Sequence, residues 1–340
     1  MKQKRNLMCL IIAIMALCLL SGCGGGTGDQ EQTAPKKEEP IVYVSPLTGE
    51  ESETEYPARP LVVSIDNVGD AIPQSWISKT DLVYEFPVEG QQSRLNAIYY
   101  SEFPEEFGPI RSTRPYFVDL TREYKGIFLA HGWSPAAREY LQSGVVPYIN
   151  AMTSSLDFYR VDDKEGPHDS YIKWSEVKSG IDENGWWDEK QDIRPFAFLA
   201  KDEASAGEAA SYIEVDYGAS ECEYTYDAEK NLYYRSINGE AYVDHETGEQ
   251  IAVSNILVQH VSSQVLDRKG RLEINMCAGG DAMLFTNGKV VKGTWSRTDL
   301  DSRTVFVDAE GNEFKLSVGS SWVQVVDQDT YVAYEAPETE

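Results

Sequence analysis

The sequence predicts an α+β protein in which a mixed α/β domain precedes a mostly antiparallel β domain. Between residues 59 and 205, short apolar runs such as Leu61–Ile65 alternate with helix signals. After residue 206 the helical spacing ends, and apolar and polar residues alternate, as in 222–226. Asn287-Gly288 is typical of a tight hairpin turn. We therefore place the two domains at 59–205 and 206–330.

Strands and two helices are expected in the first domain. Pro115 suits the first turn of a helix, because its fixed φ is already helical. Ser134 suits the cap of a second helix that starts at Pro135, and Gly144 suits its end. The expected strands lie at 61–65, 81–89, 95–103 and 127–130.

Short strands fill the second domain, with a second hairpin turning at Gly311-Asn312. Residues 331–340 are expected to form an acidic tail. The expected strands lie at 222–226, 232–234, 256–260, 272–276, 282–285, 304–306, 313–316 and 322–326.

The first 22 residues have the layout of a secretory signal peptide. Basic residues precede an uncharged apolar run, Leu7–Leu20, and Leu20-Ser21-Gly22-Cys23 follows. The run is shorter than the roughly 20 residues of a spanning helix. The order before Cys23 resembles a bacterial lipobox, which implies acyl chains such as palmitate on that cysteine. An uncleaved helix that happens to end near a cysteine is the alternative. Residues 23–58 are expected to form a flexible tether.

Charge restricts the partners that this chain can bind. The 340 residues carry a formal net charge of -26, which argues against binding to nucleic acid. It also argues against direct adhesion to anionic lipid. Neutral, cationic or metal-bearing partners fit better. The alternative is that the acidic surface serves only to keep the protein soluble.

Two of the five cysteines, Cys222 and Cys277, lie in the expected folded region. They could form a disulfide in an oxidising compartment, or they could be buried separately as thiols. Their spacing does not decide between these alternatives.

The densest polar cluster lies in the first domain. Glu85 and Glu89 would share a face if the strand continued past Pro87, and two close carboxylates could share a proton or bind a cation. Ion pairs with nearby arginines are the simpler interpretation. The candidate ligand-binding residues are Asp66, Asn67, Glu85, Glu89, Arg94, Arg111, Arg114 and His168.

The segment Arg111–Pro115 is the most specific part of that cluster. Two arginines just before a helix can present guanidinium groups and backbone N–H groups to one carboxylate or phosphate. Alternatively, one arginine fixes the loop through carbonyl groups and the other pairs with Asp119.

The sequence gives little support to a nucleophilic or a metal-dependent catalytic site. Ser134 follows His131 closely but is better explained as a helix cap, and no GxSxG occurs. A zinc site at His131 and His168 would lack an HExxH motif and cysteine ligands. We therefore expect no cofactor, no metal ion and no catalytic residues.

A set of motifs extends over nearly all of the mature chain. The motifs are Arg59-Pro60, 65–67, 73–75, 78–85, 88–90, Gly108–Phe117, Gly132, Ser134-Pro135, Pro167-His168, Gly288-Lys289, Gly293–Arg297 and Gly319–Val323. They resemble those of the YerB-like bacterial lipoproteins, a domain family of unknown function. That resemblance implies an exported lipoprotein with an α/β first domain and a β-rich second domain, but no activity.

The sequence as a whole predicts a lipid-anchored, extracytoplasmic binding module of the cell membrane. Its partner would be a fragment of the cell envelope or a membrane protein. The alternative is an envelope hydrolase in which Asp66 or Glu89 acts as base and His168 as acid.

Overall fold

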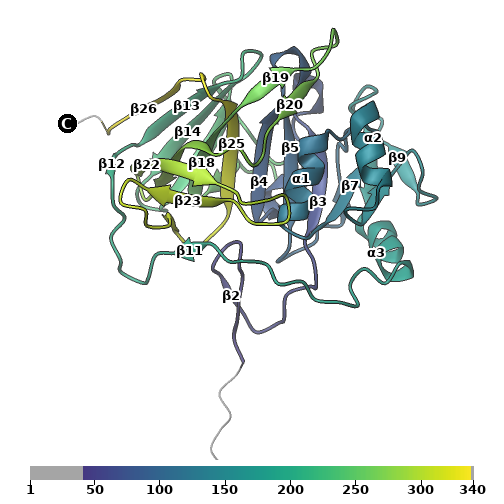
Figure 1. The fold of residues 1–340 in the computed structure, drawn as a ribbon, viewed down its shortest axis with the longest axis horizontal. Coiled ribbons are helices and arrows are strands. Elements are labelled where there is room, and N and C mark those ends of the chain that lie inside the picture. The colour runs from purple at the N-terminus through teal and green to yellow at the C-terminus, as the bar shows by residue number, and fades with distance from the viewer. Residues whose placement is uncertain (1–40, 338–340) are drawn as a thin grey trace, which may run out of the picture. The chain divides into compact units, whose positions relative to one another are not determined.

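This computed structural model describes residues 41–337. Its largest sheet has 11 strands (Figure 1). Three α-helices belong to the same described part. In spatial order the sheet contains β12 (Glu208–Ala209), β22 (Lys289–Ser296), β21 (Gly280–Thr286), β18 (Asn255–Val261), β25 (Ser321–Asp327), β4 (Leu82–Pro87), β5 (Ser93–Tyr99), β3 (Leu61–Asp66), β7 (Ile127–Ala130) and β8 (Tyr148–Asn150), with β23 (Val305–Asp308) paired to β22.

The centre of this sheet joins the two regions that the sequence predicts as separate domains. β4 pairs in parallel with β25, with Leu82 opposite Ser321. β25 pairs in parallel with β18 on its other side. The hydrogen-bonded sheet is therefore continuous across the predicted boundary between 205 and 206.

Helices cover both faces of the sheet at its β3–β7–β8 end, where these three strands are parallel. α1 (Pro115–Glu123) and α2 (Pro135–Gln142) lie in front of β3 and β7 in Figure 1. They pack on the face that carries Val62 and Phe128. α3 (Trp174–Glu183) packs on the opposite face with Ile149. Successive strand residues thus serve opposite layers of the core.

A second sheet of six strands packs near β18 and β25. Its alternating residues Tyr224 and Tyr233 belong to the same buried cluster as Ile256 and Trp322. This period of two is the one that the sequence predicts for half-buried strands. The strands are β16 (Glu240–Ala241), β15 (Leu232–Ile237), β14 (Glu221–Asp227), β13 (Tyr212–Asp216) and β26 (Val332–Glu335), with β17 (Ala252–Val253) paired to β15.

Four small sheets complete the described fold. They contain β1 (Tyr43–Val44) with β2 (Glu51–Ser52), β6 (Glu106–Phe107) with β10 (Ser170–Lys173) and β9 (Phe158–Arg160), β11 (Ala197–Phe198) with β24 (Lys315–Leu316), and β19 (Ser263–Val265) with β20 (Leu272–Ile274).

The local turn and cap signals lead to the expected elements. Pro115 begins α1, and the Ser134 hydroxyl accepts a hydrogen bond from the Ala137 N–H at 3.3 Å at the start of α2. Asn287 and Gly288 both have positive φ in the turn between β21 and β22, which a tight hairpin of this type requires.

Both ends of the described chain differ from the sequence-based expectation. Residues 41–58, expected in the tether, include the paired strands β1 and β2, and Leu47 between them is fully buried. At the other end, residues 332–335 form β26 beside β13 instead of an acidic tail. The segment 41–58 also contacts a remote part of the chain, because the Phe196 N–H donates to Pro46 O, and β26 pairs with the remote strand β13. Composition alone does not reveal such contacts.

The expected hairpin at Gly311-Asn312 is also only partly present. A single bridge joins Val307 to Glu313, and β24 then pairs in parallel with β11 instead of continuing along β23.

Candidate functional site

Polar side chains gather where the parallel strands β3, β7 and β8 end. Asp66 is the last residue of β3, and His131 follows β7 directly. The segment 111–113 inserts between these strand ends: the Arg111 N–H donates to Ser64 O, and the His131 N–H donates to Arg111 O. Carboxyl ends of parallel strands commonly carry ligand sites in sheets of this kind.

Asp66 is the central acceptor of this site. Its Oδ2 lies 2.8 Å from His168 Nδ1 and 3.0 Å from Arg111 Nε. The Asp66 side chain is 1% exposed, whereas Arg111 retains 26% and His168 14%. The carboxylate therefore holds two partly exposed cationic or proton-carrying groups at the surface.

Arg114 and Glu89 form a two-pronged ion pair beside this group. Arg114 Nε donates to Glu89 Oε1 at 2.8 Å, and Nη2 donates to Oε2 at 2.7 Å. Burial opposes ionisation of Glu89, but the hydrogen bonds from Arg114 outweigh it and lower the pKa of this carboxyl. The simpler interpretation of Glu89 from the sequence, an ion pair with a nearby arginine, is therefore confirmed.

A third guanidinium, that of Arg94, completes the site. Its Nη1 donates to Ser112 O at 2.7 Å, and Nη1 atoms of both Arg94 and Arg114 approach Ser112 Oγ, at 3.3 and 3.2 Å. Burial, followed by repulsion from Arg114, lowers the pKa of Arg94 to about 10. Of the two arginines before the helix, Arg114 fixes the loop through a carbonyl group, since it donates to Thr113 O, whereas Arg111 pairs with Asp66 and not with Asp119.

The net charge of the site is opposite to that of the chain. Its three arginines face two carboxylates, those of Asp66 and Glu89, which leaves one positive charge in excess. The chain as a whole has a formal charge of -26. We name Asp66, Glu89, Arg94, Arg111, Arg114 and His168 the arginine site.

Two predicted site residues, Asn67 and Glu85, do not belong to this surface. Asn67 Nδ2 donates to Glu85 Oε1 at 2.9 Å, and Glu85 pairs with Arg235 at 3.0 Å. Glu85 is fully buried and Asn67 is 3% exposed. Glu85 and Glu89 also have different cation partners, because β4 ends at Pro87. The predicted shared carboxylate pair is therefore wrong, and Asn67 and Glu85 serve the core.

The remaining predicted groups have separate environments. Cys222 and Cys277 are both free thiols, so the disulfide alternative is wrong: Cys222 is buried in β14, while Cys277 lies beyond β20. His131 Nδ1 lies 2.5 Å from Ser170 Oγ. Asp119 bonds the Tyr140 hydroxyl and not a residue of the arginine site. Cys23 and the predicted signal peptide lie outside the described residues.

Across residues 41–337, His, Cys, Asp and Glu side chains form no group of three or more that could hold a metal ion. Nor does that range contain a helix with the length and apolar character needed to cross a membrane.

Comparison with protein families assigns both halves of the chain. Residues 47–187 match the family model described as "Protein of unknown function (DUF3048) N-terminal domain", and residues 213–323 match the corresponding C-terminal domain. The chain belongs to the DUF3048 family. In this DUF3048 chain the pairing of β4 with β25 therefore joins the two family domains within one sheet.

A similar protein from Bacillus subtilis (strain 168) carries the name "Putative lipoprotein YerB". It is 36% identical over 289 residues, which cover 83% of this chain and 86% of the relative. The crystal structure of YerB from Bacillus subtilis is similar with a TM-score of 0.77 and 34% identity, covering 86% of this chain and 99% of that chain. The resemblance to YerB-like proteins is thus confirmed.

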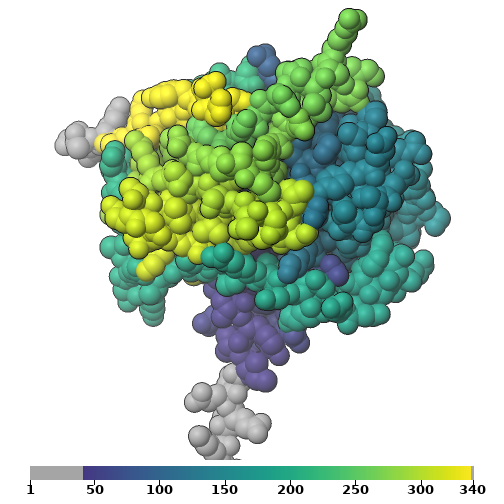
Figure 2. All heavy atoms as spheres, viewed as in Figure 1, coloured from purple at the N-terminus to yellow at the C-terminus, as the bar shows by residue number. Residues whose placement is uncertain are grey.

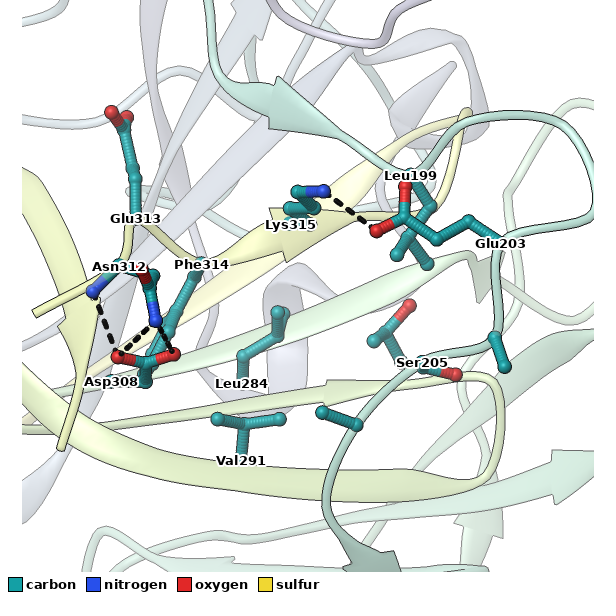
Figure 3. A pocket seen from close by; sticks show the side chains of 13 residues that line it. Leu199, Glu203, Ser205, Leu284, Val291, Asp308, Asn312, Glu313, Phe314 and Lys315 are labelled. Atoms are coloured by element: carbon teal, nitrogen blue, oxygen red, sulfur yellow. Dashed lines mark hydrogen bonds and ion pairs between the residues drawn. The ribbon is translucent and has the colours of Figure 1, made fainter. Parts of the chain in front are cut away.

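A pocket of about 310 Å³ lies in the second half of the DUF3048 chain, away from the arginine site (Figure 3). Leu284, Val291 and Phe314 give it an apolar base. Lys315 Nζ donates to Glu203 Oε1 at 2.6 Å on one side of the pocket. Figure 3 also shows the hydrogen bonds between Asn312 and Asp308 on another side. None of the candidate ligand-binding residues predicted from the sequence lines this pocket.

Sequence reasoning missed Arg235, the partner of Glu85. Arg235 lies in β15 between the buried residues Tyr233 and Ile237, so it occupies the inward-facing position of an alternating strand. A charged residue at such a position is rare without a buried partner. This signal was present in the sequence, but it does not identify the partner.

Proposed function

We propose that this chain is a lipoprotein held on the outer side of a bacterial membrane and that its folded part is a non-catalytic binding module. The order Leu20-Ser21-Gly22-Cys23 supports acyl chains on Cys23, and the Bacillus relative carries the word lipoprotein in its name. Two or more acyl chains provide stable anchoring without a spanning helix.

The binding module acts through the arginine site and takes a carboxylate-bearing ligand, such as the peptide part of a cell-envelope fragment. The observation that carries this proposal is the excess of guanidinium groups in a strongly acidic chain. Arg111 is the most exposed of the three arginines, and its fork geometry matches a carboxylate. Ser112 holds Arg94 and Glu89 holds Arg114 through hydrogen bonds. The positive charges of these two arginines contribute to the electrostatic potential around Arg111.

Binding of a soluble peptidoglycan fragment tests this function. The fragment with free peptide carboxylates should bind, and the same fragment with amidated carboxylates should bind at least tenfold more weakly, a loss of about 1.4 kcal/mol. Arg111→Ala should cause a similar loss, and Arg111→Lys a smaller one. The matched control is Arg268→Ala, which removes an exposed arginine elsewhere. Equal binding of both fragments, or unchanged binding by folded Arg111→Ala, contradicts the proposal.

The membrane anchor has its own test. Cells that express the wild-type chain should incorporate labelled palmitate into it and retain it in the membrane fraction. Cys23→Ser should abolish the labelling and release the folded part from that fraction. Labelling that persists in Cys23→Ser would refute acylation at this residue.

A second candidate function, an envelope hydrolase, is favoured by the contact of 2.8 Å between Asp66 and His168. A buried carboxylate that binds Nδ1 orients the ring and leaves Nε2 as the atom for proton transfer. Glu89 is less suited to the role of base because Arg114 occupies both of its oxygens. Incubation with peptidoglycan and mass analysis decides: a product that His168→Asn eliminates, without loss of fold, supports the enzyme.

A further inference from the structure

Two hollows share the side chain of Tyr56, on a part of the surface that the arginine site does not use. One has a volume of about 420 Å³ and the other about 570 Å³, within the range of roughly 300–1,000 Å³ that is usual for small-molecule sites. We name them together the tyrosine groove. Its lining residues used below are Glu50, Glu51, Tyr56, Tyr100, Ser101, Gln191 and Asp192.

The groove forms where the β1–β2 segment meets the segment that precedes β11. The Gln191 N–H donates to Ala58 O, and the Phe196 N–H donates to Pro46 O, so backbone hydrogen bonds hold the two segments together. Figure 1 shows the chain between α3 and β11 passing the β1–β2 hairpin, and Figure 2 shows their atoms (teal and purple) side by side. The walls are therefore fixed by the fold.

Tyr56 is a preorganised aromatic platform. Its ring stacks on that of Tyr100 with 5.4 Å between centroids and 11° between planes. Tyr100 is 3% exposed, so it supports Tyr56 from the protein side. The Tyr56 hydroxyl donates to Glu50 O at 3.0 Å, which fixes the ring further. One face of Tyr56 thus rests on Tyr100, and its exposed part belongs to the groove.

Tyr100 also brings an unused polar group to the groove. Within residues 41–337 no protein group hydrogen-bonds its hydroxyl, and that oxygen keeps some exposure at the wall of the hollow, although the residue as a whole is 3% exposed. Burial, followed by the nearby charge of Asp81, raises the pKa of Tyr100 to about 12, so the hydroxyl keeps its proton and can donate. The hydroxyl is therefore available to donate to a ligand in the hollow.

The charge of the groove limits what it can bind. Glu50, Glu51 and Asp192 line it, and its lysine, Lys190, is already paired with Glu55. Carboxylates here repel anionic ligands and accept hydrogen bonds from hydroxyl or ammonium groups. Ser101 and Gln191 add further neutral hydrogen-bonding groups.

We propose that the tyrosine groove binds a neutral or amino-bearing saccharide chain, with Tyr56 stacked on one sugar ring and the two hollows holding units on either side of it. A pyranose ring has an apolar face of C–H groups, which suits a flat tyrosine ring, and hydroxyl groups around its edge, which suit the polar walls. The Tyr100 hydroxyl donates to one of these oxygens. This site goes beyond the proposed carboxylate-binding function and does not depend on Arg111.

Titration of the full chain with three oligosaccharides tests the proposal. The probes are a tetramer of β-1,4-linked N-acetylglucosamine, its partly deacetylated form, and an oligogalacturonate as the anionic probe. At least one of the first two should bind, and the anionic probe should bind at least tenfold more weakly. Absence of binding by both N-acetylglucosamine probes, or stronger binding of the anionic one, overturns the proposal.

Variants assign the binding to the groove. Tyr56→Ala should weaken it at least tenfold, and Tyr100→Phe, which keeps the ring stack but removes the hydroxyl, should weaken it severalfold. The matched control Tyr331→Ala removes a tyrosine that is 82% exposed elsewhere and should bind as the wild type does. Wild-type affinity in Tyr56→Ala overturns the site.

A measurement on the unaltered chain covers the case in which Tyr56→Ala does not fold. Bound oligosaccharide should slow the nitration of Tyr56 by tetranitromethane, followed by peptide mass spectrometry, and leave that of Tyr331 unchanged. Equal nitration of Tyr56 with and without saturating oligosaccharide contradicts the proposal. Arg111→Ala should leave saccharide binding intact, so failure of the arginine site and failure of the tyrosine groove give different results.

Discussion

Glu85 and Arg235 form an ion pair of 3.0 Å in which neither side chain is exposed to solvent. Glu85 comes from β4 in the first family domain, and Arg235 comes from β15 in the second. Trp322 Nε1 and Gln324 Nε2 each donate to Glu85 Oε2 at 3.0 Å. The guanidinium also lies 4.5 Å from the Trp322 ring centroid. The pair is thus a fully buried polar contact between the two sheets.

Arg235→Met should destabilise the protein by about 3–5 kcal/mol, because removal of one partner leaves the other charge buried without compensation. Equilibrium unfolding in urea, followed by tryptophan fluorescence, measures the change. The double variant Glu85→Gln, Arg235→Met should recover part of the loss, because it removes the uncompensated charge. A loss below about 1 kcal/mol, the usual range for exposed pairs, would show that solvent reaches the cluster.

A fragment that ends at residue 205 should not fold to a stable native state. Without β25, the parallel partner of β4, the fragment exposes a long unpaired edge, and Glu85 loses Arg235. We expect poor dispersion of amide resonances and no cooperative thermal transition. A well-dispersed spectrum for residues 41–205 would contradict the interdependence of the two halves.

Gly293→Ala should destabilise the chain by about 1–3 kcal/mol, the usual cost of overpacking. A Cβ at this position would lie 1.9 Å from Val307 O, so β22 and β23 would have to separate. Gly69→Ala is the matched control, because a Cβ at Gly69 meets nothing within 4 Å. Its effect should stay within about 0.5 kcal/mol. Comparable losses in the two variants would mean that the sheet adapts at Gly293.

The two folded-region thiols should differ in reactivity. Cys222 is fully buried, and burial raises the pKa of its thiol, so little thiolate forms at neutral pH. Burial raises the pKa of Cys277 as well, but this residue is partly exposed. Alkylation under native conditions, mapped by mass spectrometry, should modify Cys277 first and Cys222 only after unfolding. Arg235 Nη2 lies 3.1 Å from Cys222 Sγ, so equal rates would show that the Glu85–Arg235 cluster opens readily.

His131 should make the protein less stable in mildly acidic solution. Burial, followed by the charges of Arg160 and Arg111, lowers the pKa of His131 in the folded state. The unfolded chain takes up this proton near the ordinary value of about 6.5, so stability falls as pH drops below that value and levels off below the lowered folded pKa. His131→Asn should flatten this part of the pH–stability profile. An unchanged profile would mean that His131 titrates alike in both states.

Features that depend on neighbouring residues could be predicted from the sequence. The start of α1 at Pro115, the cap at Ser134 and the hairpin at Asn287-Gly288 follow from local backbone geometry, and the structure has all three. The alternation in β14 and β15 likewise indicates half-buried strands. These signals are short in range and need no knowledge of the rest of the fold.

Features that depend on remote partners could not be predicted. A buried carboxylate such as Glu85 needs a cation, but the sequence offers nearby arginines and does not indicate that β15 brings Arg235 instead. The parallel pairing of β4 with β25 has no local turn to mark it. The arginine site is intermediate: Arg111 and Arg114 stood out as a pair, whereas burial removed Asn67 and Glu85 from the predicted surface.

The position of β4 between β5 and β25 also governs how this polypeptide matures. Synthesis proceeds from the N-terminus, so β4 waits beside β5 with its other edge open until residues 321–327 leave the ribosome. Completion of the sheet is therefore nearly the last event, and pairing between such distant segments is slow. A newly made chain therefore cannot complete its central sheet until nearly all of its residues are available.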